Sequence, residues 1–131
     1  MATIFSKIIA GDIPSYKVAE NEKCFAFLDI NPLAKGHTLI VPKQETDYLF
    51  DIEDDLYSEL MIFAKKVASG IEKTVNCKRI AVVVLGLEVP HAHIHLIPIQ
   101  KETDISFANK RVKLTKEEMI EIAEKISQSI S

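Results

Sequence analysis

The stretch Val89-Pro90-His91-Ala92-His93-Ile94-His95-Leu96 places a histidine at every second position, with a small or apolar residue in each gap. This period is that of a β-strand, whose successive side chains point to opposite faces of the sheet. We therefore expect the three histidines to form one row, while Ala92, Ile94 and Leu96 face the core. Imidazoles in such a row lie about 6.5 to 7 Å apart, so a charge on one lowers the pKa of the next and favours neutral rings near pH 7.

All four histidines of the chain point to one site. Three fall within the five residues from His91 to His95, and the fourth, His37, opens a second strand-like run that ends at Pro42. Histidines on a strand can form an ordinary polar face, but this clustering favours a functional site. Neutral imidazole can act as a nucleophile, a general base or a metal ligand, and the spacing alone does not choose among these roles.

The composition limits the partners that the chain can bind. A length of 131 residues with 47% hydrophobic content predicts a single domain over 1–131. The formal net charge of -3, from 16 basic and 19 acidic residues, leaves no broad cationic surface for polymeric DNA or RNA. A single nucleotide remains compatible, because backbone N–H groups and a few imidazoles can hold its phosphates.

The sequence also predicts a cytoplasmic protein that does not bind membranes. Its first residues lack the pattern of a signal peptide, and the longest apolar run, Ile80–Leu85, is too short to cross a bilayer. Cys24 and Cys77 are isolated from each other and are expected to be reduced thiols.

Hydrophobic spacing predicts an α+β fold with an antiparallel meander sheet of about five strands, one long helix and short terminal helices. The core covers residues 4–98 and is followed by a C-terminal extension. The expected elements are a short helix over 4–10, a hairpin of 16–19 with 23–28, strands over 37–42, 80–85 and 89–96, a long amphipathic helix over 54–75, and a final helix over 115–130.

Three local patterns refine this prediction. The run Ile80–Leu85 is apolar at every position, as expected for a central strand that is covered on both faces. Asn76 is expected to end the long helix in a left-handed conformation. Thr115 and Glu118 have the spacing of a capping box at the start of the final helix.

The row of imidazoles suits chemistry at phosphorus. His93, the central member, has a neighbour on either side that can contact the oxygens of a reacting group. An imidazole attacks phosphorus readily and leaves again readily, which divides the cleavage of a phosphoanhydride or phosphoramidate into two easier displacements. Phosphate therefore fits this pattern better than a peptide does.

Residues 91–97 resemble the signature of the histidine triad (HIT) family, and residues 4–14, 26–32 and 36–43 are similar to the family's opening, its nucleoside strand and its next strand. The resemblance is to the Hint-like branch. It implies the HIT-like fold, a homodimer with one site per subunit, and no cofactor. It also implies a purine nucleotide hydrolase or transferase that cleaves a phosphoramidate or phosphoanhydride bond at the α-phosphate through a nucleotidyl-histidine intermediate.

The resemblance also implies a role for each histidine. His93 is similar to the nucleophile, His91 to the residue whose carbonyl group orients the nucleophile, His95 to a ligand of phosphate oxygens, and His37 to a supporting fourth histidine.

The same resemblance implies the residues that bind the nucleotide. Asp29 would accept hydrogen bonds from the ribose hydroxyls, and the main-chain N–H groups of Glu88 and Val89 would hold phosphate. The residues expected to enclose the base are Phe5, Ile8, Phe27, Ile30 and Leu39. Taken singly, each apolar member could equally be a plain core residue, and Asp29 could be a turn residue.

The chain departs from the family pattern in two places. Leu87 occupies a position where the family commonly has glutamine, and the connection before the histidine strand is shorter and contains no asparagine, so we expect an altered rate or substrate. Some bacterial relatives bind structural zinc through two cysteines and further histidines. Thr3, Ser6 and Glu45 stand at such positions here, and we expect no metal.

Two alternatives stay open. The departures at Leu87 and the missing asparagine are compatible with a non-catalytic protein that binds or senses nucleotides. His91, His93 and His95 could instead hold the zinc of a hydrolase, although ligands at alternate strand positions would need considerable bending to converge on one ion. Only Glu88 lies close enough in sequence to orient such ligands.

Overall fold

The computed structural model describes residues 2–130, which form strands, α-helices and two short 3-10 helices. In chain order the elements are α1 (Ile4–Ala10), β1 (Lys17–Glu20), β2 (Cys24–Leu28), β3 (Thr38–Pro42), η1 (Leu49–Asp51), α2 (Asp54–Thr74), β4 (Arg79–Val83), β5 (Ile94–Ile99), η2 (Glu102–Ile105) and α3 (Lys116–Ser129). None of the helices in this range is both long enough and apolar enough to cross a membrane.

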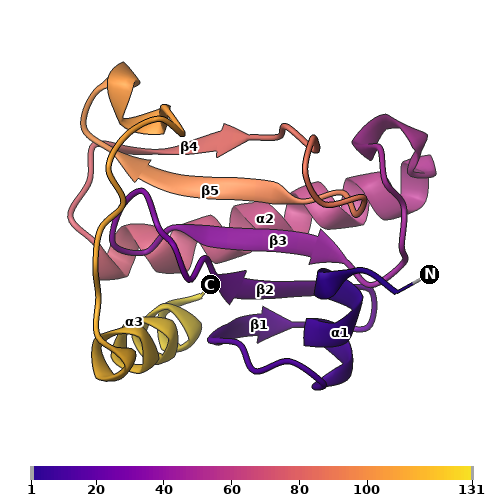
Figure 1. Ribbon diagram of the computed structural model, residues 1–131, viewed down its shortest axis with the longest axis horizontal. Helices are drawn as coiled ribbons and strands as arrows, with labels where there is room; N and C mark the ends of the chain where they lie inside the picture. Colours follow the sequence, from indigo (N-terminus) through magenta and orange to yellow (C-terminus); the bar gives the residue numbers. More distant parts are fainter. Residues whose placement is uncertain (1, 131) are drawn as a thin grey trace.

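The strands form one antiparallel sheet in the order β1-β2-β3-β5-β4 (Figure 1). The predicted hairpin, the strand that follows His37 and the helices at both ends are all present. At the start of α3 the capping box is complete, because Glu118 donates its N–H to the Thr115 hydroxyl and accepts the Thr115 N–H. The predicted α+β class with five antiparallel strands is therefore confirmed.

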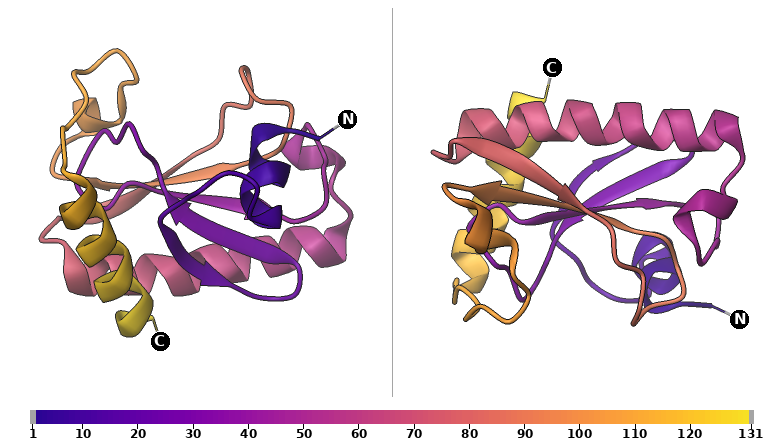
Figure 2. Two further views of the ribbon diagram at one scale, coloured as in Figure 1. Left: turned by 60° about the horizontal axis from the view of Figure 1, so that its bottom comes forward. Right: turned by 90° about the horizontal axis from the view of Figure 1, so that it is seen from above.

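One face of the sheet holds the main core. Alternate residues of β2, namely Cys24, Ala26 and Leu28, pack there with Ile40 of β3 and with the apolar stripe of α2. The stripe residues Leu60, Phe63, Val67 and Ile71 are buried, as the helical spacing predicted. Helix α2 runs along this face, whereas α1 lies on the other side of the sheet (Figure 2).

The opposite face carries an aromatic cluster. Phe5 of α1 packs there with Phe25 and Phe27 of β2 and with Leu39 and Val41 of β3. Because side chains alternate along a strand, β2 and β3 supply this cluster with the residues that the main core does not use. Across the sheet Phe27 pairs with Leu39, and Leu39 pairs with His95 of β5, so a histidine extends the same row.

The predicted strand over 89–96 begins later than expected. β5 starts at Ile94, and His91 and His93 lie in an irregular segment ahead of it. Here the ladder with β3 has ended, and the N–H of Ala92 donates instead to the main-chain oxygen of Thr46 at 2.7 Å. The predicted inward residues are nevertheless buried in the main core, namely Ala92, Ile94 and Leu96.

Two other predictions are wrong. The apolar run Ile80–Leu85 supplies most of β4, but β4 is an edge strand, because among residues 2–130 only β5 pairs with it. Val82 of β4 is 55% exposed and Leu85, in the loop after β4, is 53% exposed, so the run is not covered on both faces. Asn76 does not cap α2 in a left-handed conformation: between residues 2 and 130, only glycines have a positive φ, and α2 ends into an extended Val75.

Candidate active site

The ring of His93 has one nitrogen occupied and one free. Its Nδ1 lies 2.8 Å from the main-chain oxygen of His91. A carbonyl oxygen only accepts hydrogen bonds, so Nδ1 carries the proton and, in the neutral ring, Nε2 has the free lone pair. Phe5 contacts His93 edge-on, with 4.9 Å between the ring centroids. His93 thus presents Nε2 as a nucleophile or base from a ring that is fixed on both sides.

The ring of His91 has no free nitrogen. Its Nε2 lies 2.8 Å from the main-chain oxygen of Pro42, and its Nδ1 lies 2.8 Å from the Thr3 hydroxyl. The carbonyl oxygen fixes the proton on Nε2, so in the neutral ring Nδ1 accepts the hydrogen bond from Thr3. The side chain of His91 therefore supports the site, and its main-chain oxygen is the group that meets His93.

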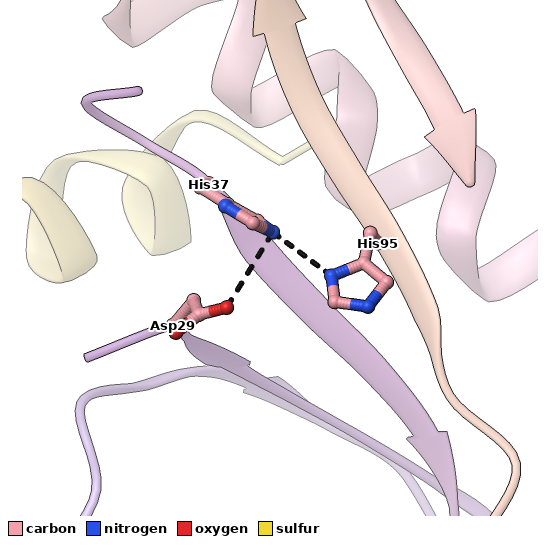
Figure 3. A group of neighbouring side chains, drawn as sticks. All are labelled: Asp29, His37 and His95. Carbon is pink, nitrogen blue, oxygen red and sulfur yellow. Dashed lines mark hydrogen bonds and ion pairs between the residues drawn. The ribbon is translucent and has the colours of Figure 1, made fainter. Parts of the chain in front are cut away.

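His37 sets the tautomer of His95. The N–H of Leu33 donates to Nδ1 of His37 at 3.0 Å, so neutral His37 carries its proton on Nε2. That Nε2 lies 3.0 Å from Nδ1 of His95 and donates to it. The remaining nitrogen of His95, Nε2, must then carry a proton and is a hydrogen-bond donor. Figure 3 shows His95 and Asp29 approaching the same nitrogen of His37.

Burial keeps both of these rings neutral at pH 7. It lowers the pKa of His37 to about 3, with smaller effects from His95 and Arg111. It lowers the pKa of His95 to about 4, assisted by His93 and Arg111. The expectation of neutral rings therefore agrees with these two pKa values, although desolvation outweighs the repulsion between neighbouring histidines. The contact of 3.6 Å between His37 Nε2 and an Asp29 oxygen is consequently not an ion pair at pH 7.

Exposure separates the histidines into two pairs. His91 and His37 are 0% and 1% exposed, whereas His93 and His95 keep 8% and 7% of their surface. The centroids of the His93 and His95 rings lie 5.1 Å apart, closer than the regular strand spacing predicts, because the backbone at His93 is not in the ladder. The two rings that a ligand can reach are thus adjacent, one with a free lone pair and one with a free N–H.

The predicted nucleotide-binding residues fall into two groups. Phe5, Phe27 and Leu39 are buried together on the face of the sheet that carries the histidines, and Ile8 packs against them half-buried. Ile30 is 78% exposed and does not join this cluster.

Asp29 lies at the end of β2, where one carboxylate oxygen accepts the N–H of Asn31 at 2.9 Å. Burial raises the pKa of its carboxyl group above the ordinary value. Its second oxygen faces His37, so the carboxylate lies at the border of the histidine cluster.

The loop before the histidines leaves main-chain donors available. Glu88 is exposed and Val89 is half-buried against the aromatic cluster. Within residues 2–130 no acceptor receives the N–H of either residue. Leu87, at the position of the family's glutamine, is 88% exposed.

One group of side chains in residues 2–130 has the geometry of a metal site, namely Asp29, His37 and His95, whose ligand atoms lie within 4.8 Å of one another. The set His91, His93 and His95 proposed for a zinc hydrolase does not form such a group there. A metal on Nε2 of His37 would move its proton to Nδ1, where it would face the N–H of Leu33. The hydrogen-bonded arrangement therefore opposes an ion at this position.

Sequence reasoning missed two residues that close the site. Phe107 lies edge-on to His95 with 4.9 Å between centroids, and 6.4 Å from His37. The guanidinium carbon of Arg111 lies 5.4 Å from the centre of the Phe107 ring, and its Nη1 donates to the main-chain oxygen of Asn31 at 2.8 Å. In the sequence, the only indication of this closure was Phe107 itself, a single aromatic residue in the polar connection after Pro98.

A large hollow lies away from the histidines. It has a volume of about 790 Å³ and lies between the turn at Leu33–Lys35, the end of α2 and the segment 104–112. No histidine lines it, and its walls mix polar and apolar side chains. We place the candidate site by the chemistry of the histidines rather than by the size of a hollow.

Comparison with known proteins identifies the family. A model of the HIT domain matches residues 10–102. The chain is 42% identical over 102 residues to adenosine 5'-monophosphoramidase HNT1 of Saccharomyces cerevisiae, covering 77% of this chain and 65% of that protein. It is 33% identical over 132 residues to adenosine 5'-monophosphoramidase hnt1 of Schizosaccharomyces pombe, covering 99% of each. The chain belongs to the HIT family.

The fold of a solved HIT relative agrees with this assignment. A Hit-like protein from Bartonella henselae superposes with a TM-score of 0.83 at 29% identity, over 98% of this chain and 96% of that one. All four histidines of this HIT protein fall within the residues that the family model matches. Thr3, Phe107 and Arg111 lie outside them.

Proposed function

We propose that this HIT protein hydrolyses purine nucleoside phosphoramidates, or transfers their nucleotidyl group, with His93 as the nucleophile. The observation that carries the proposal is the hydrogen bond from Nδ1 of His93 to the main-chain oxygen of His91, which leaves Nε2 with its lone pair free. The names of the two yeast relatives support the phosphoramidate class.

In the first displacement, Nε2 of His93 attacks the α-phosphorus. The bond from Nε2 to phosphorus forms while the bond from phosphorus to the leaving nitrogen breaks, and the departing amine takes a proton from solvent. The imidazole becomes cationic during this step, and the His91 carbonyl oxygen stabilises that charge through the Nδ1–H. In the second displacement, water attacks phosphorus, the bond to Nε2 breaks, and a nucleoside monophosphate and a proton leave.

His95 serves as the neutral donor to a phosphate oxygen. Its Nδ1 accepts from His37, so its Nε2–H points away from His37 (Figure 3), and its pKa of about 4 keeps the ring uncharged at pH 7. The free main-chain N–H groups of Glu88 and Val89 would hold the other oxygens.

The nucleoside would lie against the aromatic cluster beside the histidines. Phe5, Ile8, Phe27 and Leu39 offer an apolar surface for a purine, and Asp29 offers a carboxylate for the ribose hydroxyls. We leave Ile30 out of this proposal, because its side chain extends into solvent.

The test is turnover of adenosine 5'-phosphoramidate by the wild-type protein and by His93→Ala. We expect the substitution to reduce kcat by several orders of magnitude while AMP still binds, roughly the loss that follows deletion of a covalent route. Wild-type protein stopped during turnover in denaturant without acid should carry an added nucleotidyl mass, and the variant should not. A variant that keeps more than about a tenth of the wild-type rate contradicts the covalent role of His93.

A second candidate function is nucleotide binding without catalysis. It is favoured by Leu87, which is 88% exposed and has no group that could donate a hydrogen bond to a leaving atom. It predicts that AMP binds to the wild-type protein and that no phosphoramidate, dinucleoside polyphosphate or nucleotide sugar is turned over.

We also propose that the protein is a cytoplasmic homodimer. Among residues 2–130 the strand β4 has a neighbour on one side only, and exposed apolar residues lie on it and just after it, at Val82 and Leu85, a combination that pairing with a second copy would cover. Cys24 and Cys77 are both free thiols, as expected in a reducing compartment.

A further inference from the structure

A cluster of polar side chains contacts the ring of His91. It joins the start of α1 to the loop after β3 and comprises Thr3, Ser6 and Glu45. A Glu45 carboxylate oxygen accepts the main-chain N–H of Thr3 at 3.0 Å and also accepts the Ser6 hydroxyl. The Thr3 hydroxyl oxygen accepts the N–H of Ser6 at 3.0 Å. These bonds determine where the hydroxyl of Thr3 points.

The proton of that hydroxyl has two acceptors within reach. One is the Ser6 hydroxyl oxygen, 3.1 Å away, which gives its own proton to Glu45 and keeps its lone pairs. The other is Nδ1 of His91, at the shorter distance of 2.8 Å, whose lone pair is left free because Pro42 holds the ring proton on Nε2 and which would be buried without a hydrogen bond if Thr3 did not donate to it. Thr3 is 8% exposed and His91 is 0% exposed, so water does not compete for this bond. The hydroxyl of Thr3 therefore donates to His91.

This bond continues to the candidate nucleophile. His91 is held at both ring nitrogens, by Thr3 at the N-cap of α1 and by Pro42 from β3, and it lies in a segment without ladder bonds. Its own main-chain oxygen accepts from Nδ1 of His93 at 2.8 Å. The peptide that carries this carbonyl group is also held by the N–H of Ala92, which donates to the main-chain oxygen of Thr46 at 2.7 Å. The two side-chain bonds of His91 add a second restraint, from the side of its ring.

We propose that Thr3 is a positioning residue for His93: its hydroxyl anchors the His91 ring, and the anchored His91 carbonyl holds the proton of His93 on Nδ1 and leaves Nε2 free. Glu45 and Ser6 aim the hydroxyl of Thr3. The catalytic consequence rests on the proposed function, whereas the consequence for the tautomer of His93 does not.

Two substitutions separate the hydroxyl from the rest of the side chain. Thr3→Val keeps the shape and removes the donor, and Thr3→Ser keeps the donor and removes the methyl group. We expect Thr3→Val to lower kcat about tenfold to a hundredfold with little change in KM, the usual range for residues that orient a reactive group. Thr3→Ser should restore kcat to within roughly threefold of the wild type. Thr74→Val, which removes a hydroxyl that donates within α2, is the matched control.

A second measurement does not depend on turnover. Proton–nitrogen correlation spectra of the histidine rings distinguish nitrogens that carry a proton from those that do not. We expect a single Nδ1–H form of His93 in the wild type and in Thr3→Ser, and a mixture of ring forms in Thr3→Val. Glu45→Ala should shift the same signals in the same direction by a smaller amount, because Thr3 then keeps its hydroxyl but loses the acceptor of its N–H.

The outcomes can be told apart. If Thr3→Val keeps the Nδ1–H form of His93, or if Thr3→Ser is as impaired as Thr3→Val, the positioning role is wrong. A loss of thermal stability in Thr3→Val with unchanged kcat would likewise assign Thr3 a purely structural role. If the wild-type protein turns over no phosphoramidate, the proposed function fails, and the ring spectra still decide the role of Thr3.

Discussion

Nε2 of His37 lies 3.0 Å from Nδ1 of His95, and burial lowers the pKa of both rings. The direction of this hydrogen bond is determined by a main-chain group, the N–H of Leu33, at the far nitrogen of His37. A fully buried histidine thus controls which nitrogen of a reachable histidine carries the proton. The supporting role that the family resemblance implied for His37 has a specific physical form, which can be tested.

Replacement of His37 should impair His95 without touching the substrate. His37→Leu removes the donor to Nδ1 of His95, so His95 can shift its proton away from the outward Nε2. We expect kcat for adenosine 5'-phosphoramidate to fall by about tenfold to a hundredfold. His37→Gln, whose amide nitrogen can occupy the position of Nε2, should retain more activity. Equal rates for the two variants would show that the donor is not the important feature.

Stability should fall as the pH is lowered from about 6.5 to 4. The folded-state pKa values of His37 and His95 are lowered to about 3 and about 4, so the unfolded chain binds more protons in this window. In this window each of the two histidines lowers the free energy of unfolding by at most about 1.4 kcal/mol for each unit by which the pH falls. Their contribution to stability is complete above pH 6.5 and is lost as the pH falls toward the folded-state pKa values. Urea unfolding at several pH values measures this slope, which His95→Gln should reduce. An unchanged slope in that variant contradicts the prediction.

Phe107 should help to keep His95 neutral. Its ring covers His95 edge-on at 4.9 Å between centroids, and the largest cause of the low pKa of His95 is burial. Phe107→Ala should admit water and raise the pKa of His95 toward its ordinary value, as followed by NMR titration of the ring. Ile105→Ala, in the neighbouring η2 and 38% exposed in the wild type, is the control and should leave that pKa where it was.

The exposed edge of β4 should be a subunit interface. Val82→Lys places a charge on that strand and is expected to convert the protein from a dimer to a monomer in light scattering at micromolar concentration. Ile120→Lys, on the exposed side of α3, should remain dimeric. A wild-type protein that is already monomeric under these conditions would refute the homodimer.

Gly70 should be required for the contact between α2 and α3. A Cβ atom at this position would lie 2.6 Å from the main-chain oxygen of Ile126, which cannot swing aside. Gly70→Ala gains about 1 kcal/mol of helix propensity but forces the two helices apart at a cost of about 1–3 kcal/mol. We expect a net loss of unfolding free energy in urea. As a control, Glu72→Ala, at an exposed position of the same helix, should change the free energy of unfolding little. If Gly70→Ala were more stable than the wild type, α3 would be free to move away and the prediction would be wrong.

The sequence predicted the parts of the fold that depend on local pattern. The spacing of Leu60, Phe63, Val67 and Ile71 specified the buried face of α2, and the alternation around Ile94 specified which side chains enter the core. The edge position of β4 could not be predicted in this way, because a strand that is apolar on both faces looks the same whether its neighbour is in its own chain or in another. The candidate site divides in the same way. Its histidines could be recognised from their spacing in the sequence, whereas the contacts that orient them could not.

The contacts that orient the histidines were not visible, because they come from distant or main-chain groups. The N–H of Leu33 and the oxygen of Pro42 carry no side-chain signal. Thr3 attracted notice only as a residue in the place of a metal ligand, and Arg111 gave no signal. Which hydroxyl faces which ring depends on the packing of α1 against the sheet, and packing is decided by the whole chain.

Two widely separated parts of the chain, Thr3 and the segment around Arg111, close on the histidine site, and this has a consequence for how the protein acquires activity. Thr3 bonds to a residue 88 positions later, and Arg111 bonds to one 80 positions earlier. Such pairings are formed late, because closing long loops costs entropy before the contacts compensate for it. During synthesis the nascent chain should therefore hold its histidines without orienting them. Catalytic competence would appear only after the segment around Arg111 has emerged, so activity would report on completed folding.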